Sequence, residues 1–455
     1  MRVSHGVSAV FDDPNLVSCA GLAPVLALAQ RCGLHQLAAG VSVSGPARAN
    51  PGVKVPALVA GMVAGADSID DLDLLRHGGI GRLFGGVRAP STLGSFLRAF
   101  RFGHLRQLDK VAAGLLTNLA RHTPLLRDAD QMTLIDIDDT VKATFGYAKQ
   151  GAGYGYTKVK GLNALLGIIS TPISAPVIAA TRLRKGSTNS TRGAARLAAD
   201  TLATAARCRA SGLVVVRGDS AFYNADVVAA IRRRGARFSI TARHDRAVVA
   251  AISGIPEQAW TPIHYPEAIY DEQQQRWVSD AEVAETPYTA FTSRRLGRQV
   301  SARLIVRRVR RLNTTPGQDE LVPGYRYHAV FTDTPLPMVQ AEHCHRGHAI
   351  VEQVIADLKQ GPLAHLPSGS FTANGAWLVC AAIAFNLTRA AGCLASAFHA
   401  KATTGTIRTQ LITIPARIAS SARRLVLHLP TDWPWEHPWR ELFTASCGPP
   451  VPAEP

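Results

Sequence analysis

The chain has 455 residues, 47% of them hydrophobic and 6% aromatic, so it is long enough for two or three domains with buried cores. Its 50 Lys and Arg residues outnumber its 33 Asp and Glu residues and give a formal net charge of +17. Arg supplies 41 of the basic residues, and its planar guanidinium matches the geometry of phosphate oxygens. This excess predicts a polyanionic partner, most simply nucleic acid, although GC-rich coding would also enrich Arg and Ala together.

Cysteine usage and hydropathy exclude several classes of protein. The seven cysteines are odd in number and contain no C-x-x-C pair, which favours a reducing cytoplasm over a disulfide framework or a zinc ribbon. The N-terminus soon becomes polar at Asp12-Asp13-Pro14, so no signal peptide is expected. Two apolar stretches, 162–180 and 377–385, are interrupted by Asn and Pro or are too short to span a bilayer. We therefore expect a soluble, cytoplasmic, nucleoid-associated protein with no membrane partner.

Helical patterns dominate residues 1–125. Pro90 begins one helix, Gly103 separates it from the next, and Arg98 and Arg101 lie on this pair. Earlier apolar runs predict helices over 22–31, 34–39 and 55–63. A helical DNA-binding domain and a helical domain with an ordinary basic surface explain this region equally well.

From residue 126 the pattern is that of a mixed α/β domain, expected to run to residue 255. Residues 132–140 predict a buried strand that ends in acids, and apolar residues 162–170 belong to an antiparallel meander of about three strands. A helix over 191–209 and a βαβ unit over 213–241 follow.

The remaining chain divides into three further predicted segments. Residues 256–335 form a β-rich insertion, because 302–310 and 325–331 have strand patterns. The catalytic core resumes over 336–400 and includes an apolar, buried helix at 374–391, and residues 401–455 form a helical tail.

Three carboxylates are candidates for a metal site. Asp138 and Asp219 end two predicted strands, and Glu352 lies on a helix that begins at Gly347. Mg²⁺ prefers oxygen ligands, and two such ions suit in-line phosphoryl displacement. Lys359 follows Glu352 by two helical turns on the same edge, which suits a phosphate contact beside a metal ligand. For this helix alone, a solvated Glu and Lys is the simpler interpretation.

Two other sites compete for these residues. Asp136-Ile137-Asp138-Asp139-Thr140 matches the opening of haloacid-dehalogenase-type phosphatases, in which the first Asp is the nucleophile. Those enzymes need a helix after this strand and a later acidic pair, whereas this sequence has Gly-rich hairpins and no acid close enough to Asp219. A zinc site at His343-Cys344-His345 and His348 lacks a second ligand pair at finger spacing.

These residues together resemble a DDE-type insertion-sequence transposase, in the group with a β-rich insertion between the second Asp and the Glu. The resemblance extends end to end and includes Asp136–Thr140 and Arg217-Gly218-Asp219-Ser220-Ala221-Phe222 as the two catalytic strand ends. Glu352 and Lys359 match the Glu and Lys of the family's Tyr-Arg-Glu-Lys signature. His345 stands at the Tyr position and His348 at the Arg position, while Arg346 lies two positions early.

The resemblance implies an α/β fold: an RNase H-like mixed-sheet catalytic core, an all-helical N-terminal domain and a β-rich insertion. It implies two Mg²⁺ ions, or Mn²⁺ in their place, held by Asp138, Asp219 and Glu352. Asp136 and Asp138 share one strand face, and Asp138 is preferred as the ligand because first strands of this family tend to read Asp-x-Thr.

The same resemblance implies what the protein binds. The partners are the terminal inverted repeats of an element and its target DNA, joined by cut-and-paste transfer in a homodimer, with DNA contacts from Lys359, Arg346 and His345. The alternative function is a catalytically inactive, DNA-binding regulator derived from such an element.

The insertion predicts one further DNA contact. Relatives with a β-rich insertion are expected to cut the second strand through a DNA hairpin, and a base extruded from that hairpin needs an aromatic surface on which to stack. Trp277 lies beside Arg276 in a polar stretch and is the candidate, with Trp260 as the alternative. An ordinary packed Trp is the simpler interpretation.

Overall fold

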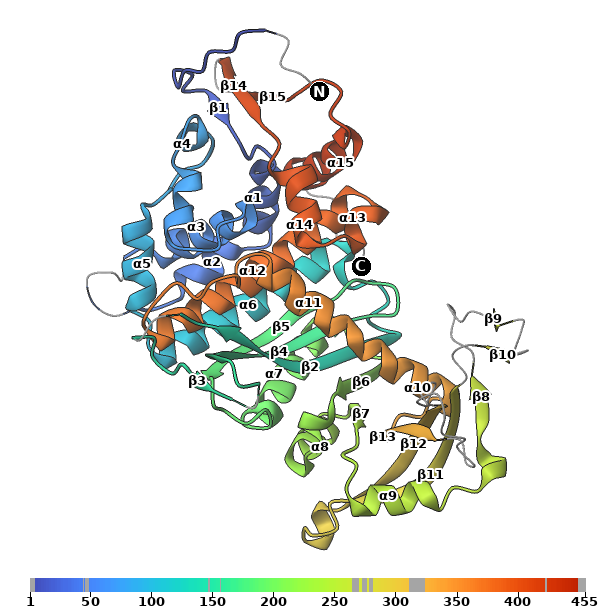
Figure 1. Ribbon diagram of the computed structural model, residues 1–455. Helices are drawn as coiled ribbons and strands as arrows, with labels where there is room; N and C mark the ends of the chain where they lie inside the picture. Colours follow the sequence, from blue (N-terminus) through green and yellow to red (C-terminus); the bar gives the residue numbers. More distant parts are fainter. Residues whose placement is uncertain are drawn as a thin grey trace. The chain divides into compact units, whose positions relative to one another are not determined.

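A computed structural model describes residues 5–43, 45, 49–145, 148–155, 157–263, 270–271, 276–277, 281–310, 324–421 and 424–448. The chain folds as two compact units (Figure 1). The helical unit comprises Met1–Leu125, Gly146–Gln150 and Asp357–Pro455, and the sheet unit comprises Leu126–Phe145 and Gly151–Ala356. Both ends of the chain therefore belong to the helical unit, and the sheet unit is inserted between them.

The N-terminal helices of the helical unit lie close to their predicted positions. Gly33 separates the first two helices with φ of +79°, a left-handed conformation that suits glycine. The last of these helices has Arg101 as its N-cap residue. Gly103 therefore lies within the first turn of this helix instead of separating it from the preceding one. The helices are α1 (Leu22–Arg31), α2 (Leu34–Ala39), α3 (Pro51–Ala64), α4 (Ile80–Leu83), α5 (Pro90–Arg98) and α6 (Phe102–His122).

Helix α12 (Phe371–Ala395) forms the core of the helical unit. It contacts α1, α3, α5 and α6, and Trp377 is fully buried with its indole nitrogen donating to the carbonyl of Pro362 at 2.6 Å. The helix is long and apolar enough to cross a membrane, but 89% of its apolar window is buried in the protein, which is typical of a core helix. We expected this helix in the catalytic core, whereas it packs with the N-terminal helices.

The C-terminal segment differs from the predicted helical tail. Ile414, Ala416 and Ile418 are buried and alternate with exposed residues, a period of two that favours a strand over a helix. Leu16 pairs with Arg417, so the N-terminal region is not all-helical either. The elements are β1 (Leu16–Val17), α13 (Ala397–Lys401), α14 (Thr404–Ile407), β14 (Ala416–Ser421), β15 (Arg424–His428) and α15 (Glu436–Cys447).

The sheet unit is built on a mixed sheet in the order β5-β4-β2-β6-β7, with β3 also paired to β4. Strand β4 is antiparallel to both β2 and β5, whereas β6 is parallel to β2 and β7 is parallel to β6. This order is compatible with an RNase H-like core. The strands are β2 (Met132–Ala143), β3 (Gly153–Tyr154), β4 (Lys160–Ser170), β5 (Val177–Lys185), β6 (Leu213–Gly218) and β7 (Arg237–Thr241).

The helices of this core connect the strands as the βαβ pattern predicts. Helix α7 (Ala194–Arg207) joins β5 to β6 and packs on β4 and β5, and α8 (Ala225–Arg232) joins β6 to β7. A Cβ atom at Gly167 of β4 would lie 2.0 Å from Thr201 Oγ1, so glycine permits the close approach of α7. Because β2 continues into an antiparallel hairpin, the arrangement disfavours the phosphatase interpretation.

The predicted insertion is an extension of the same sheet. Strand β13 pairs antiparallel with β7, placing Phe331 opposite Ile240, and β12, β11 and β8 follow outward. The elements are α9 (Arg246–Ser253), β8 (Thr261–Ile263), β9 (Tyr270–Asp271), β10 (Arg276–Trp277), β11 (Ala281–Ala290), β12 (Val300–Arg310) and β13 (Tyr325–Thr332).

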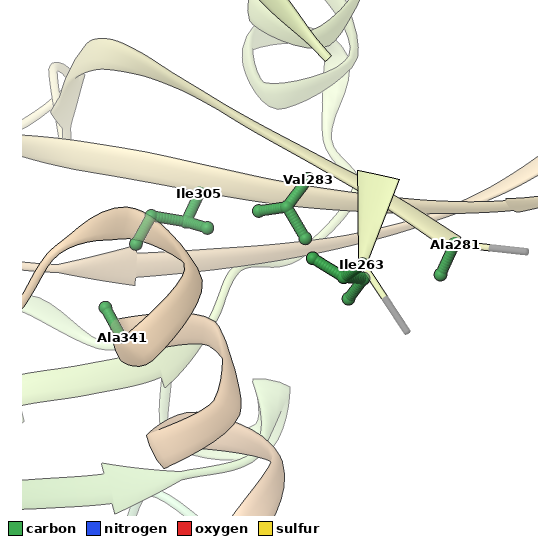
Figure 2. Close-up of a cluster of buried hydrophobic side chains, with 5 residues drawn as sticks. All are labelled: Ile263, Ala281, Val283, Ile305 and Ala341. Atoms are coloured by element: carbon green, nitrogen blue, oxygen red, sulfur yellow. The ribbon is translucent and has the colours of Figure 1, made fainter. Parts of the chain in front are cut away.

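Helix α10 (Met338–Arg346) covers part of this extension. Figure 2 shows Ala341 of the helix facing Ile305, in a buried cluster that also contains Val283, Ile263 and Ala281. The helix predicted from Gly347 is interrupted, because Gly347–Ala349 forms a 3₁₀ turn before α11 (Ile350–Lys359). The boundary between the two units falls within α11, after Ala356.

Candidate active site

Two carboxylates lie on the neighbouring parallel strands β2 and β6. The strand that was expected to end in acids continues to Ala143, so Asp138 lies within β2, whereas Asp219 directly follows β6. Ile137 pairs with Gly218, so Asp138 and Asp219 follow at neighbouring positions. Burial raises the pKa of Asp138 to about 6, and the negative charge of Asp219 adds to this shift. Burial also raises the pKa of Asp219, whose Oδ1 accepts a hydrogen bond from the Ala221 amide at 3.0 Å. Within the described residues neither carboxylate forms an ion pair with Lys or Arg, so burial decides the direction of both pKa shifts.

Asp136 has the opposite environment, although it shares a strand face with Asp138. Its carboxylate is fully buried and accepts two hydrogen bonds from Arg217, each 2.7 Å long. His348 Nδ1 lies 2.8 Å from the same carboxylate. Burial alone would raise the pKa of Asp136, but the contact with His348 and the charge of Arg217 outweigh it and lower the pKa. Asp136 is thus occupied by protein cations and donors.

Arg217 is fixed by the last turn of α10 as well as by Asp136. Its Nη1 donates to the carbonyl of Cys344, and its side chain is 2% exposed. A Cβ atom at Gly347 would lie 2.8 Å from Nη1, so glycine at this position leaves room for the guanidinium. The interruption of the helix at Gly347 and the buried ion pair are therefore coupled.

Asp139 points to the other face of β2 and has its own cation. It forms a salt bridge with Arg184 of β5, and Asn163 of β4 donates to it at 3.0 Å. Arg184 Nε also donates to Asn163 at 2.9 Å. Of the three acids Asp136, Asp138 and Asp139 of β2, Asp138 is thus the one that no arginine among the described residues contacts.

The other predicted site residues of the sheet unit lie on α10 and α11. Glu352 is exposed on α11. Among the described residues, no group of three or more His, Cys, Asp or Glu side chains is placed to hold a metal ion. The structure therefore brings Asp138 and Asp219 together but does not complete a ligand set with Glu352. The same finding disfavours the zinc interpretation of the histidine cluster.

His345 does not present its ring to solvent. Its Nδ1 lies 3.0 Å from the Ser239 hydroxyl and its Nε2 lies 3.0 Å from the Thr241 hydroxyl. Burial lowers the pKa of His345 to about 3. Both ring nitrogens are occupied by β7, so this residue ties α10 to the sheet instead of contacting phosphate directly.

The remaining predicted DNA contacts are dispersed. Arg346 is partly exposed and forms a salt bridge with Glu342 at 3.1 Å. Arg98 and Arg101 are exposed on the helical unit, and Lys359 follows the unit boundary in α11. Strand β10 includes Trp277, but the side chain of Trp277 lies outside the described residues.

Sequence reasoning did not find the buried partners of this site. In the sequence, Arg217 stands out only as part of the motif that contains Asp219, and Gly347 only as the first residue of a predicted helix. The signal was present, since Arg217 interrupts the apolar strand 213–216 one residue before Gly218. A charged residue inside a buried strand requires a buried counter-ion.

The mixed sheet, with Asp138 in β2 beside Asp219 after β6, is compatible with the RNase H-like core of enzymes that act on nucleic-acid phosphates. The chain matches the family model described as "Transposase DDE domain group 1" over residues 2–445, and it therefore belongs to this family of DDE transposases. A comparison with curated proteins finds no match. Members of the family act on DNA in transposition, which agrees with the net charge of +17.

Proposed function

We propose that this protein cleaves DNA at the terminal inverted repeats of an element and joins the freed ends to target DNA in a cut-and-paste reaction. The observation that carries the proposal is the contrast between neighbouring acids. Asp136 and Asp139 are each bonded to arginine, whereas burial raises the pKa of both Asp138 and Asp219. Carboxylates held without a cation in this way fit a divalent metal ion.

Asp138, Asp219 and Glu352 would hold two Mg²⁺ ions, or Mn²⁺ in their place. Glu352 is exposed in the first turn of α11, directly after the 3₁₀ segment Gly347–Ala349. When bound, such ions activate the attacking oxygen and stabilise the leaving oxygen of a phosphodiester. The clamped acid Asp136 would shape the site without binding metal.

The helical unit would bind the element ends. Arg98 and Arg101 are exposed on consecutive helices, and guanidinium groups contribute salt-sensitive contacts to phosphate. Lys359 and Arg346 would contact the DNA backbone near the site. Synapsis of two ends would require a homodimer, and the second strand would be cut through a hairpin, with Trp277 as the stacking residue.

The test is a cleavage assay with the full chain, Mg²⁺ and duplexes that carry the ends of the encoding element. Asp138→Asn, Asp219→Asn and Glu352→Gln should each abolish nicking while leaving DNA binding nearly unchanged. Asp130→Asn, an exposed acid at the edge of the same unit, is the matched control and should cleave normally. Near-normal nicking by Asp219→Asn would refute the assignment, and a wild-type protein that binds without cutting would favour the inactive regulator.

A further inference from the structure

We propose that His348 is a catalytic proton acceptor in DNA cleavage, and that Asp136 and Arg217 are the positioning residues that fix its ring. This inference rests on the proposed function and adds to it a residue outside the predicted metal-binding set. It also gives a role to Asp136, the acid that competes with Asp138 in the sequence.

The contact with Asp136 selects one form of the imidazole. His348 Nδ1 lies 2.8 Å from Asp136 Oδ1, and the side chain is 15% exposed. An ionised carboxylate only accepts hydrogen bonds, so Nδ1 donates to Asp136. When the ring is neutral, Nε2 bears the lone pair, and within the described part of the chain it has no hydrogen-bond partner. The ring is therefore oriented with its basic nitrogen available.

Arg217 makes this arrangement stable without requiring a charged imidazole. Its two hydrogen bonds of 2.7 Å balance the charge of Asp136 and favour the ionised carboxylate. The carboxylate can thus accept from a neutral His348. The ring of His345 lies nearby, with its centroid 6.4 Å from that of His348 and the two planes inclined by 24°, and it is itself bonded to Ser239 and Thr241.

His348 also lies within electrostatic reach of the candidate metal ligands. When protonated, it lowers the pKa of both Asp138 and Asp219 against the larger effect of burial. The charged and titratable groups that face the ring from the surrounding elements are Asp136 and Asp138 of β2, Arg217 of β6, Asp219 after β6, and His345 of α10.

The proposed step is a proton transfer coupled to attack at phosphorus. In cleavage, a water molecule gives one proton to Nε2 while its oxygen forms a bond to phosphorus. The bond from phosphorus to the 3′ oxygen breaks, and this oxygen leaves with the electron pair and takes a proton from solvent. In strand transfer, the freed 3′ hydroxyl replaces water as the attacking group. His348 then releases its proton to solvent.

The first test measures single-turnover nicking by the full chain between pH 5.5 and 9. His348→Gln should lower the rate at neutral pH by about 10²–10⁴-fold, the usual contribution of a general base, and should remove the acid limb of the pH profile. DNA binding should not change. His343→Gln, an exposed histidine on α10 that contacts Arg346, is the matched control and should keep both rate and profile. A His348→Gln rate within about threefold of wild type, with the same acid limb, would overturn the proposal.

The second test does not depend on cleavage. In the full chain labelled with ¹⁵N-histidine and free of metal, the His348 resonances, assigned with His348→Gln, should show the tautomer protonated on Nδ1. Asp136→Asn should remove the preference for the Nδ1-protonated tautomer. A folded wild-type protein in which His348 is protonated on Nε2 instead would overturn the proposal. If wild type fails to nick DNA at all, the proposed function fails, and the tautomer still decides the orientation of His348.

Discussion

Replacing Asp138 by Asn is expected to stabilise the metal-free protein while abolishing its activity. The pKa of Asp138 is raised to about 6 in the folded state, so folding favours the protonated carboxyl. The stability that depends on this proton is fully present below the pKa of the unfolded chain and is lost as the pH rises through 6. Asparagine keeps the shape of the neutral acid and cannot ionise.

The magnitude follows from the shift. The pKa rises from 3.8 to about 6, and a shift of one pKa unit corresponds to about 1.4 kcal/mol. The gain in unfolding free energy from Asp138→Asn therefore has an upper limit of about 3 kcal/mol at pH 8. Because Asp219 contributes to the shift, part of this free energy belongs to the pair. At pH 4.5 the unfolded carboxylate is mostly ionised and the folded one protonated, so the gain falls to about 1 kcal/mol.

The assay is thermal unfolding in EDTA at pH 8 and at pH 4.5. At pH 8, Asp138→Asn should raise the Tm of the sheet unit by several degrees, since about 1 kcal/mol shifts the Tm of a domain of this size by ~2–4 °C. Asp130→Asn, an exposed acid in the same unit, should change little at either pH. A destabilised Asp138→Asn protein at pH 8, or an equal gain at both pH values, would refute the electrostatic reasoning.

Three further predictions use other parts of the structure. Asp136→Asn should destabilise the sheet unit by about 3–5 kcal/mol in urea unfolding, because it leaves the buried charge of Arg217 without its partner; an unchanged unfolding midpoint would contradict this. Arg98→Ala and Arg101→Ala should each weaken binding to element ends and reduce the salt slope by about one unit in a titration against NaCl, and an unaltered slope would remove these residues from the interface. Trp277→Ala should nick the first strand and stall before the hairpin on denaturing gels, so a normal hairpin yield would end its proposed stacking role.

The strands were predictable from sequence where apolar residues form a continuous run or alternate regularly with polar ones. Strand β2 has apolar residues before its acids, and β6 is a run of valines, so their positions follow from the pattern alone. Residues 416–421 belong to the tail that the sequence predicts to be helical. Buried and exposed residues alternate around Ala416 and Ile418, and this segment forms β14, which pairs with β15 and with β1 near the N-terminus. Such long-range pairing is not visible in a local window.

The candidate site was predictable in its acids and not in their environments. Asp138 and Asp219 each follow an apolar run, which is a local signal, although β2 continues past Asp138 to Ala143. The choice between Asp136 and Asp138 depends on which neighbour each carboxylate meets. That neighbour is Arg217, brought opposite Asp136 by the register of β2 and β6. His348 reaches the same carboxylate from a turn 212 residues further along the chain. Neither contact has a signature in sequence spacing.

The insertion of one unit within the other has a consequence for synthesis of the protein. The sheet unit is complete once residue 356 has left the ribosome, but the helices of residues 1–125 must await α12, which ends at Ala395, and the strands and helix that follow it. A chain released early by a nonsense codon or a frameshift therefore carries a finished sheet beside helices without their core. The helical unit assembles only when the C-terminal residues have been translated, so truncated copies should not compete with the full chain for the ligand of this unit.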